Sequence, residues 1–336
     1  MNRALTFDDV ALVPQYNNIP SRLEPSLETW LTKKIKIAIP IVPANMDTVI
    51  GGELAEVITS YGSAPIFHRF CSIDQKRSWA KRFPQCFISY GLDRGNWQFP
   101  DSSNICFDVA HGHCETMLRA VEEVKNTYPE VQIIAGNVCT PQAVHDLFTA
   151  GADAVKVGIG PGAACTTRSV TGFGVPQFTA IQECARMGRK LRIPIIADDG
   201  IRNSRDIVLA LAAGASTVMI GKLFALTAES SADKRGPHFS DPSKTYIRWE
   251  AKYRGQASAD FQNDYYGGLK PGTVAEGETF WAPVSGSAKS LIEGLCAGIR
   301  SGFTYGGARD ITELQRKAEF VEVTQTYHDE MAVRND

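Results

Sequence analysis

Short apolar segments of strand length recur along the chain, and amphipathic segments of helical length separate most of them. Strands that alternate with helices form parallel sheets, and strands that are apolar throughout are buried on both faces. Eight such units in one chain favour a TIM (β/α)8 barrel over an open sheet. The predicted strands span residues 39–43, 64–67, 85–89, 105–109, 131–135, 153–157, 193–197 and 216–220. The helical segments span residues 52–61, 73–83, 114–127, 141–150, 177–189 and 203–213.

Two stretches lack clear periodicity. The link over residues 90–104 shows no obvious helix. A longer segment follows the last predicted strand and is rich in glycine and aromatic residues, before a helix expected at 286–301. Long segments of this kind inside an enzyme are usually lids or binding loops. We therefore expect a single catalytic domain over residues 1–336, with a mobile flap at about 253–285.

The charge balance and the cysteines restrict the class of protein. Lys and Arg number 35 against 37 Asp and Glu, which gives no reason to expect nucleic acid or an anionic membrane as a partner. No apolar run is long enough to cross a bilayer, and the N-terminus has no apolar stretch typical of a secretory signal. The 8 cysteines include no CxxC pair, which is typical of thiols in a reducing compartment. We expect a cytoplasmic enzyme.

Polar residues or glycines follow nearly every predicted strand, where a TIM barrel places its chemistry. Asp198 could accept hydrogen bonds from two ribose hydroxyls, or it could cap the helix that begins near Asn203. The loops after the last two strands, with Gly200 and Gly221, suit an anion. A carboxylate there repels phosphate unless it is paired. The strand-end residues are Asn45, Asp47, His68, Tyr90, Asp108, Asn137, Asp198, Gly221 and Lys222.

The loop after the sixth strand, GIGPGAACTTR (158–168), is the most informative segment. Its glycines prevent a helix and let backbone groups converge. Cys165 stands on this loop beside Arg168, as a thiolate nucleophile would, whereas we interpret the other seven cysteines as buried structural thiols. The loop also fits GxGxxA, but that fingerprint belongs at the start of a helix in the first βαβ unit, so we reject it. His111 and His113 have no third ligand spaced for zinc.

These motifs together resemble the IMP dehydrogenase and GMP reductase family. The resemblance implies a TIM barrel, normally a homotetramer, that uses a nicotinamide cofactor on a purine nucleotide. The link between the second and third strands has no room for a regulatory domain, and no Arg precedes Tyr265 in the flap, so the reductase branch is favoured. The segments that carry the resemblance are LTFDDVALVP (5–14), IPIVPANMDTV (39–49), CFDVAHGH (106–113), AGNV (135–138), GIGPGAACTTR (158–168), IADDGI (196–201), VMIGKLFA (218–225) and YRGQAS (253–258).

In that branch, the resemblance implies NADPH-dependent reductive deamination of a guanine nucleotide. Cys165 would attack carbon 2 of the purine and expel ammonia, while Thr167 and Glu276 relay a proton to the leaving amine. The carbonyls of Gly158, Gly160 and Cys165 would hold a monovalent cation such as K+. The residues implied for the cofactor are Asp108, Val109, Ala110, Asn137 and Lys156. The residues implied for the substrate are Met46, Asp198, Asp199, Gly200, Gly221, Lys222, Tyr253, Gln256 and Ala257.

Five positions depart from the family pattern. Ala163, Asp199 and Lys222 stand where Ser, Gly, and Ser or Gly are usual, at positions that face the nucleotide phosphate. Gln256 and Ala257 replace the usual Met-Gly or Met-Ser beside the base. One interpretation is a ligand other than plain GMP, such as a modified nucleotide, a different 5′ group or a nucleoside. The other is that Lys222 neutralises Asp199 and GMP remains the substrate.

Two rival functions remain at this point. The first is an IMP dehydrogenase that lacks its regulatory domain. The second is a non-catalytic purine-binding paralogue, against which the reactive groups Cys165, Thr167 and Glu276 argue, because a binding protein has no need of a nucleophilic thiol.

Overall fold

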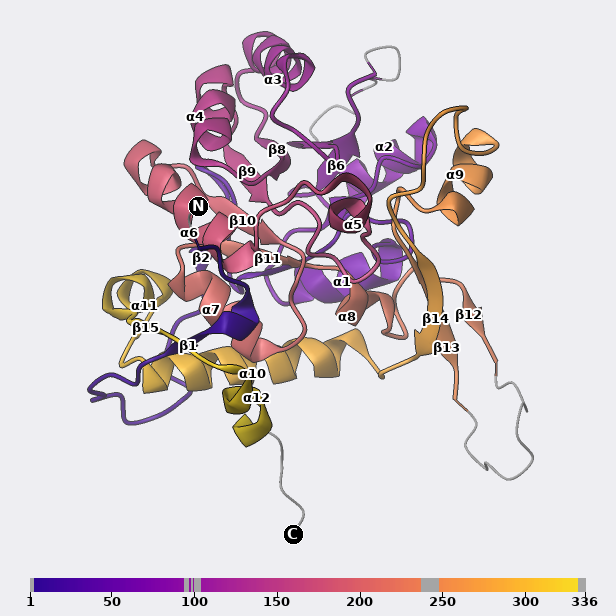
Figure 1. Ribbon diagram of the computed structural model, residues 1–336. Coiled ribbons are helices and arrows are strands. Elements are labelled where there is room, and N and C mark those ends of the chain that lie inside the picture. The colour runs from indigo at the N-terminus through magenta and orange to yellow at the C-terminus, as the bar shows by residue number, and fades with distance from the viewer. Residues whose placement is uncertain (1–2, 94–96, 98, 100–103, 237–247, 332–336) are drawn as a thin grey trace, which may run out of the picture.

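The structure is a computed structural model that describes residues 3–93, 97, 99, 104–236 and 248–331. Its centre is a sheet of eight parallel strands in the order β4-β11-β10-β9-β8-β7-β6-β5. Of these eight strands the last in the sequence, β11, thus pairs with the first, β4, and the sheet curls into a nearly closed barrel (Figure 1). Every predicted strand overlaps one of these. The strands are β4 (Ile41–Pro43), β5 (Ile66–Phe67), β6 (Phe87–Tyr90), β7 (Asn104–Asp108), β8 (Ile133–Val138), β9 (Ala154–Val157), β10 (Ile195–Asp198) and β11 (Thr217–Ile220).

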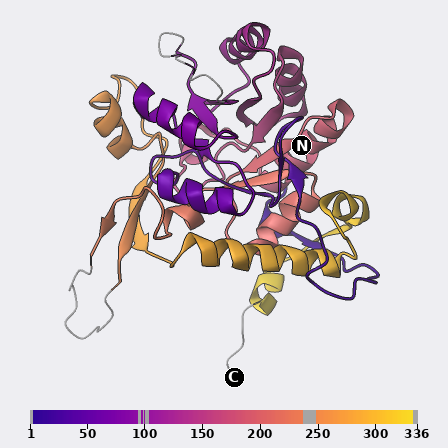
Figure 2. The same cartoon turned by 180° about the vertical axis from the view of Figure 1, so that it is seen from behind.

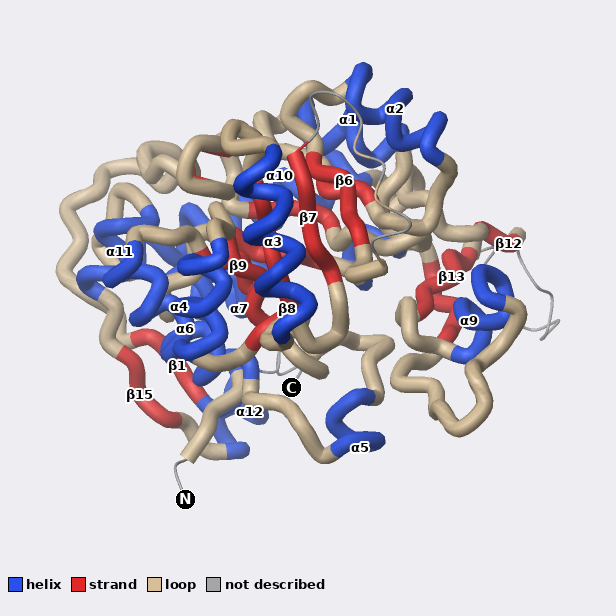
Figure 3. Tube along the Cα trace, turned by 90° about the horizontal axis from the view of Figure 1, so that it is seen from above, coloured by secondary structure: helices blue, strands red, loops and turns tan. Residues whose placement is uncertain are grey.

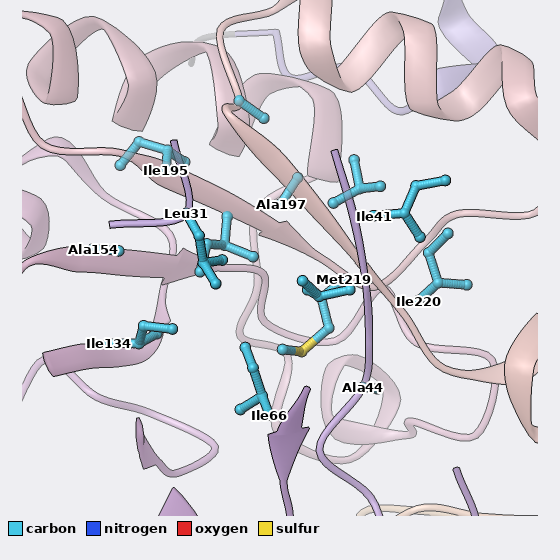
Figure 4. Packing of buried hydrophobic residues seen from close by; sticks show 14 of the residues in the cluster. Leu31, Ile41, Ala44, Ile66, Ile134, Ala154, Ile195, Ala197, Met219 and Ile220 are labelled. Atoms are coloured by element: carbon cyan, nitrogen blue, oxygen red, sulfur yellow. The ribbon is translucent and has the colours of Figure 1, made fainter. Parts of the chain in front are cut away.

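The barrel interior is filled by aliphatic side chains, so it is a packed core and not a channel. Ile66, Ile134 and Met219 come from different strands and converge in the interior (Figure 4). All three are fully buried, and most barrel strands contain no exposed residue. The continuous burial explains why these strands appear in the sequence as short apolar runs without alternation. Polar groups are therefore confined to the strand ends.

Helices cover the outside of the barrel, and local signals fix where several of them begin. Ser72, Thr140 and Asn203 each accept a hydrogen bond from a backbone N–H in the first turn of the helix that follows. Asn203 caps the helix after β10, so the alternative role of Asp198 as its cap is wrong. The helices are α1 (Gly52–Ser60), α2 (Ile73–Arg82), α3 (Glu115–Thr127), α4 (Pro141–Ala150), α6 (Gln177–Leu191), α7 (Ser204–Ala212), α8 (Lys222–Ala225) and α10 (Ala288–Tyr305).

Two links bear on the predictions. Between β5 and β6 the chain forms only α2, so no domain is inserted there. The segment over 90–104 lies partly outside the described residues, and its described residues contain no helix. Helix α10 was predicted at 286–301 and extends to Tyr305. Seen from behind, it runs beneath α1 (Figure 2).

The predicted flap has regular structure that the sequence analysis missed. β12 (Lys234–Arg235), β13 (Glu250–Arg254) and β14 (Thr279–Pro283) form an antiparallel sheet, and α9 (Ala259–Tyr266) lies between the last two strands. Seen from above, this sheet and α9 stand to one side of the barrel (Figure 3). The remaining elements are η1 (Phe7–Asp9), β1 (Val10–Leu12), β2 (Thr29–Trp30), β3 (Lys36–Ile37), α5 (Thr167–Thr171), α11 (Ile311–Lys317), β15 (Phe320–Glu322) and α12 (Gln325–Met331).

Candidate active site

A cavity of about 280 Å³ opens at the carboxyl ends of the barrel strands. Groups from β4, β7, β8, β9, β10, the loop after β9 and the flap all line it. The convergence of strand ends from most of the barrel is the arrangement that TIM-barrel active sites use. The predicted site residues in its lining are Met46, Asp108, Val109, Ala110, Asn137, Lys156, Gly158, Gly160, Cys165, Thr167, Asp198, Asp199, Tyr253, Gln256, Ala257 and Glu276.

Cys165 lies on the wall of this cavity and is half-buried. Its Sγ is 3.2 Å from Oγ1 of Thr167, which begins α5. Arg168 braces the loop, since its Nε donates to the Ile159 carbonyl at 3.0 Å and its Nη2 donates to the Val175 carbonyl at 2.7 Å. The guanidinium therefore fixes the conformation of the loop on which the thiol is presented.

The other seven cysteines differ from one another in burial, contrary to the prediction. Cys86, Cys106, Cys184 and Cys296 are buried, and burial raises the pKa of each thiol, to about 12 for the first two. Cys71, Cys114 and Cys139 are half-buried, so the prediction of seven buried thiols is wrong for these three. None of the seven lines the cavity beside Cys165.

Main-chain hydrogen bonds join the flap to the catalytic loop. The Thr166 N–H donates to the Glu276 carbonyl at 3.1 Å, and the Glu278 N–H donates to the Ala164 carbonyl at 2.8 Å. The Glu276 N–H in turn donates to the Ala257 carbonyl at 3.0 Å. This short ladder brings Glu276 to the same cavity as Cys165, as the sequence predicted, although the two are far apart in the chain.

Lys156 lies at the floor of the cavity and is 1 % exposed. Its Nζ is 2.7 Å from Oδ1 of Asp108 and 2.6 Å from Oδ2 of Asp198, and it also donates to Oδ1 of Asn137. Burial alone would lower the pKa of Lys156, but the two carboxylates outweigh it and raise that pKa well above its usual value. The three N–H donors of this ammonium are thus engaged by protein groups. Lys156 holds Asp108 and Asp198 in place.

Asn137 completes this network. Its Nδ2 donates to Oδ2 of Asp198 at 2.9 Å and to the Gly158 carbonyl at 2.8 Å. Asp108 and Asn137 are predicted to bind the cofactor, and Asp198 is predicted to bind the substrate. Lys156 contacts all three side chains and so connects the two predicted sites.

A second cavity of about 410 Å³ lies at the ends of β10 and β11. Among the predicted substrate residues it is lined by Asp199, Gly200, Gly221, Lys222 and Tyr253, of which Asp199 and Tyr253 also line the first cavity. Burial disfavours the charged form of Asp199, and with the added repulsion of Asp198 it raises the pKa of Asp199 to about 7.

Of the two interpretations of Asp199, the one in which Lys222 neutralises it has no ion pair to support it in this structure. The ion pairs among the described residues include none between these two side chains. The Lys222 ammonium instead lies 5.4 Å from the centroid of the Phe280 ring. Asp199 thus forms no ion pair within the described ranges.

The remaining predicted substrate residues come from β13 and its following turn. The Tyr253 hydroxyl contacts Sδ of Met46 at 3.7 Å, and burial raises the pKa of Tyr253 well above its usual value. Nε2 of Gln256 donates to the Asn45 carbonyl at 2.8 Å, which ties the turn to the end of β4.

Arg69 and Gln262 also line the cavity, and the sequence analysis did not single them out. Arg69 follows His68, the residue noted at the end of the second strand, so the strand-end rule extended by one position would have included it. Gln262 is on α9, a helix that was not predicted. Both residues also line a third cavity of about 700 Å³, together with Lys76, Tyr266 and Lys270.

The loop predicted to hold a monovalent cation is tied to its surroundings. The Gly158 carbonyl accepts a hydrogen bond from the Asn137 amide, and the Arg168 side chain packs so closely on Gly160 that a Cβ there would lie 2.5 Å from Cγ of Arg168. In the part of the chain that the structure describes, no group of three or more His, Cys, Asp or Glu side chains could hold a metal ion. His113 instead lies 2.9 Å from Asp146.

Over the described ranges, no helix combines the length and apolar character needed to cross a bilayer.

Comparison with known proteins agrees with this geometry. A family model described as IMP dehydrogenase / GMP reductase domain matches residues 4–85 and 101–334. GMP reductase 1 of Homo sapiens is 35 % identical over 343 residues, which cover 96 % of each chain. GMP reductase 2 of Bos taurus is 35 % identical over 96 % of this chain and 94 % of its own. GMP reductase of Caenorhabditis elegans is 33 % identical over 97 % of this chain and 93 % of its own.

Proposed function

The chain belongs to the IMP dehydrogenase / GMP reductase family, and on this premise we propose that it reduces GMP to IMP and ammonia with NADPH. The observation that carries the proposal is the convergence of Cys165, Thr167 and Glu276 on one cavity whose floor is the Lys156 network. A nucleophile, a hydroxyl within hydrogen-bond reach of it and a carboxylate are the groups that a deamination through a covalent adduct requires.

The first half of the reaction uses only groups of the protein. The Cys165 sulfur forms a bond to carbon 2 of the guanine base, and the thiol proton passes to the base. The exocyclic C–N bond then breaks, and the nitrogen leaves as ammonia with a proton relayed by Thr167 and Glu276. Carbon 2 remains bonded to sulfur and doubly bonded to a ring nitrogen. The 3.2 Å contact between Cys165 Sγ and Thr167 Oγ1 supports this assignment.

NADPH, when bound, supplies a hydride to carbon 2. The C–S bond then breaks, the thiolate of Cys165 leaves and IMP is released. Asp198 would accept hydrogen bonds from the substrate ribose, and Asp108 from a cofactor ribose, because ionised carboxylates only accept. Lys156 keeps the two carboxylates oriented.

The chain has space and charge that suit the cofactor. The cavity beside Cys165 and the 700 Å³ cavity share Arg69, Gln256 and Gln262 in their linings. Arg69, Lys76 and Lys270 add positive charge there, which suits phosphate groups. We assign Asp108, Val109, Ala110 and Asn137 to the nicotinamide half.

Three further statements belong to the proposal. Residues 1–336 form one catalytic domain, the protein acts in the cytoplasm, and it assembles as a homotetramer. A K+ ion at the carbonyls of Gly158, Gly160 and Cys165 stays a further proposal, because the Gly158 carbonyl oxygen, which accepts one hydrogen bond from Asn137, has a second lone pair.

Steady-state assays test the proposed function. The purified chain with GMP and NADPH should consume NADPH and yield IMP and ammonia in equal amounts, and Cys165→Ser should abolish this activity. Cys114→Ser is the matched control, because Cys114 is another half-buried thiol, stands at the N-cap of α3 without a side-chain cap, and serine is a good N-cap. Formation of NADH from IMP and NAD, with no reaction of GMP, would instead establish an IMP dehydrogenase. Unchanged activity of Cys165→Ser would reject the covalent mechanism.

A further inference from the structure

The Asp199 carboxylate stands where a TIM barrel usually binds phosphate. In this fold the phosphate group of a ligand is commonly held by the loops after the seventh and eighth strands, which are β10 and β11 here. Asp199 is the first residue after β10, and its side chain lines both the cavity that contains Cys165 and the 410 Å³ cavity at the ends of these strands. A ligand that extends from one cavity to the other passes this carboxylate.

Backbone geometry and two glycines hold the carboxylate in that place. Asp199 has a φ of 70°, in the left-handed region that few side chains other than Asn and Asp adopt. A Cβ added to Gly162 would lie 2.6 Å from Oδ2 of Asp199, and one added to Gly221 would lie 3.6 Å from Oδ1. The carboxyl group therefore lies between the catalytic loop and the loop after β11, and the missing side chain of Gly162 makes room for it.

The cations around this position are engaged elsewhere. Arg168 donates to two carbonyls of its own loop, and Arg202 donates to Asp8 and Asp206. Lys156 is bound by Asp108, Asn137 and Asp198. Lys222 lies over the Phe280 ring, and the ion pairs of the described ranges do not join it to Asp199. A ligand at the ends of β10 and β11 therefore meets the Asp199 carboxylate and, near it, the Lys222 ammonium, which does not pair with Asp199.

We propose that Asp199 is a specificity-determining residue that selects the 5′ end of the purine substrate, disfavouring a 5′-phosphate relative to a 5′-hydroxyl. An ionised carboxylate accepts a hydrogen bond from a hydroxyl and repels a phosphate. The chain consequently acts on a guanine nucleoside more readily, relative to GMP, than a site without this charge would. This inference rests on the proposed function, because it assumes that the base is bound at Cys165.

Removal of the charge with little change of shape tests the proposal. Asp199→Asn keeps the size of the side chain and tolerates a positive φ, and Asp199→Gly removes the side chain altogether. The measured quantity is the ratio of kcat/KM for GMP to kcat/KM for guanosine, with NADPH. We expect both variants to raise this ratio by about tenfold or more, since a single charge repulsion near a partly buried site is worth at least that factor. Glu183→Gln, which removes one charge from the outer helix α6, should leave the ratio unchanged.

The dependence of the same ratio on pH is a second readout. The titratable and charged groups that face Asp199 come from three places. Asp198, Lys156 and Asp108 belong to the network at the strand ends, and Tyr253 comes from β13. The groups around the second cavity are Lys222, Arg168, Arg202 and Asp8. The substrate phosphate itself loses its second proton near pH 6. In the wild type the ratio should fall as the pH rises through about 7, where Asp199 ionises, and it should fall less in Asp199→Asn.

The outcomes separate the two proposals. A ratio that stays constant or decreases in Asp199→Asn overturns the role of Asp199. If the wild type turns over neither GMP nor guanosine, the proposed function fails. Calorimetric titration of IMP and inosine into Cys165→Ala, with and without Asp199→Asn, then still decides on Asp199. If Asp199→Asn raises the affinity for IMP relative to the affinity for inosine, the role of Asp199 is supported. If the ratio of the two affinities is unchanged, that role is rejected.

Discussion

Among single residues, Lys156 connects the two carboxylates of the site, since its ammonium lies within 3 Å of both Asp108 and Asp198. Removal of one partner from a buried ionic cluster leaves the others unpaired and typically costs roughly 3–5 kcal/mol. We expect Lys156→Met to lower the free energy of unfolding by that order and to lower kcat/KM strongly. Lys156→Arg keeps the charge and should lose less of both. Urea denaturation of the two variants measures this, and wild-type stability of Lys156→Met would contradict the account.

His68 gives a prediction on the pH dependence of stability. Burial, with a smaller contribution from Lys76, lowers the pKa of His68 to about 4 in the folded state, against 6.5 for an ordinary histidine. Between these values the unfolded chain binds a proton that the folded chain does not, so stability is complete above pH 6.5 and declines as the pH falls toward 4. The full loss, reached near pH 4, amounts to about 3 kcal/mol, and about 2 kcal/mol of it falls by pH 5. Urea denaturation of the wild type and of His68→Phe at pH 7 and 5 measures this part, and an equal decrease in the free energy of unfolding for both proteins would refute it.

Much of the site could be predicted at this scale, because a TIM barrel places its functional residues at the carboxyl ends of its strands. Cys165, Asp108, Asn137 and Asp198 all follow or end barrel strands, so their convergence depends only on the fold. Pairings between side chains could not be predicted in the same way. The pairing of Lys222 with Asp199, one of the two alternatives, is not formed among the described residues, and the Lys222 ammonium lies over the ring of Phe280, which comes from β14.

At the scale of elements, the barrel strands were predictable and the flap was not. The barrel strands are buried on both faces and therefore appear as apolar runs. In β13 the charged residues Glu250, Lys252 and Arg254 alternate with Ala251 and Tyr253, a strand signal that the prediction did not use, whereas α9 is short and gives no strong apolar period. Their stability comes from contacts with distant residues, which no local pattern contains.

Helix α9 is held in place by ion pairs to β13 and by an aromatic cluster. Lys252 and Arg254 of β13 both pair with Asp260 of α9, at 2.7 Å and 3.0 Å. The Arg254 guanidinium bonds to Asp47 at 2.7 Å and to Asp264 at 2.5 Å, and Phe261 packs edge-on against Phe70 at 4.4 Å between ring centroids. Because Gln262 on this helix lines the cavity, the docking of α9 completes the site.

Loosening this contact should therefore affect catalysis. We expect Asp264→Asn to speed hydrogen exchange of the α9 amides and to lower kcat/KM several-fold, chiefly by raising KM. Asn263→Ala, at the adjacent position of α9, is the control and should change neither. If exchange and KM are unaltered in Asp264→Asn, the ion pair between Arg254 and Asp264 does not hold the helix.

At the scale of the whole molecule, apolar side chains remain exposed on the catalytic loop and the flap. Phe173 is 77 % exposed, Val274 is 63 % exposed and Trp249 is 56 % exposed. Large exposed apolar side chains mark a contact between subunits where they gather in one patch. This exposure supports the proposed homotetramer, and sedimentation equilibrium should give a mass of about four chains. A monomer at all concentrations would contradict that assembly.

The central claim is that the sulfur of Cys165 bonds to carbon 2 of the purine during turnover. Acid quenching of the enzyme while it reacts with GMP and NADPH, followed by peptide mass spectrometry, tests this directly. The account predicts a purine nucleotide that has lost ammonia, attached to the peptide that contains Cys165. Formation of IMP at the normal rate with no adduct, or with an adduct on another residue, would contradict it.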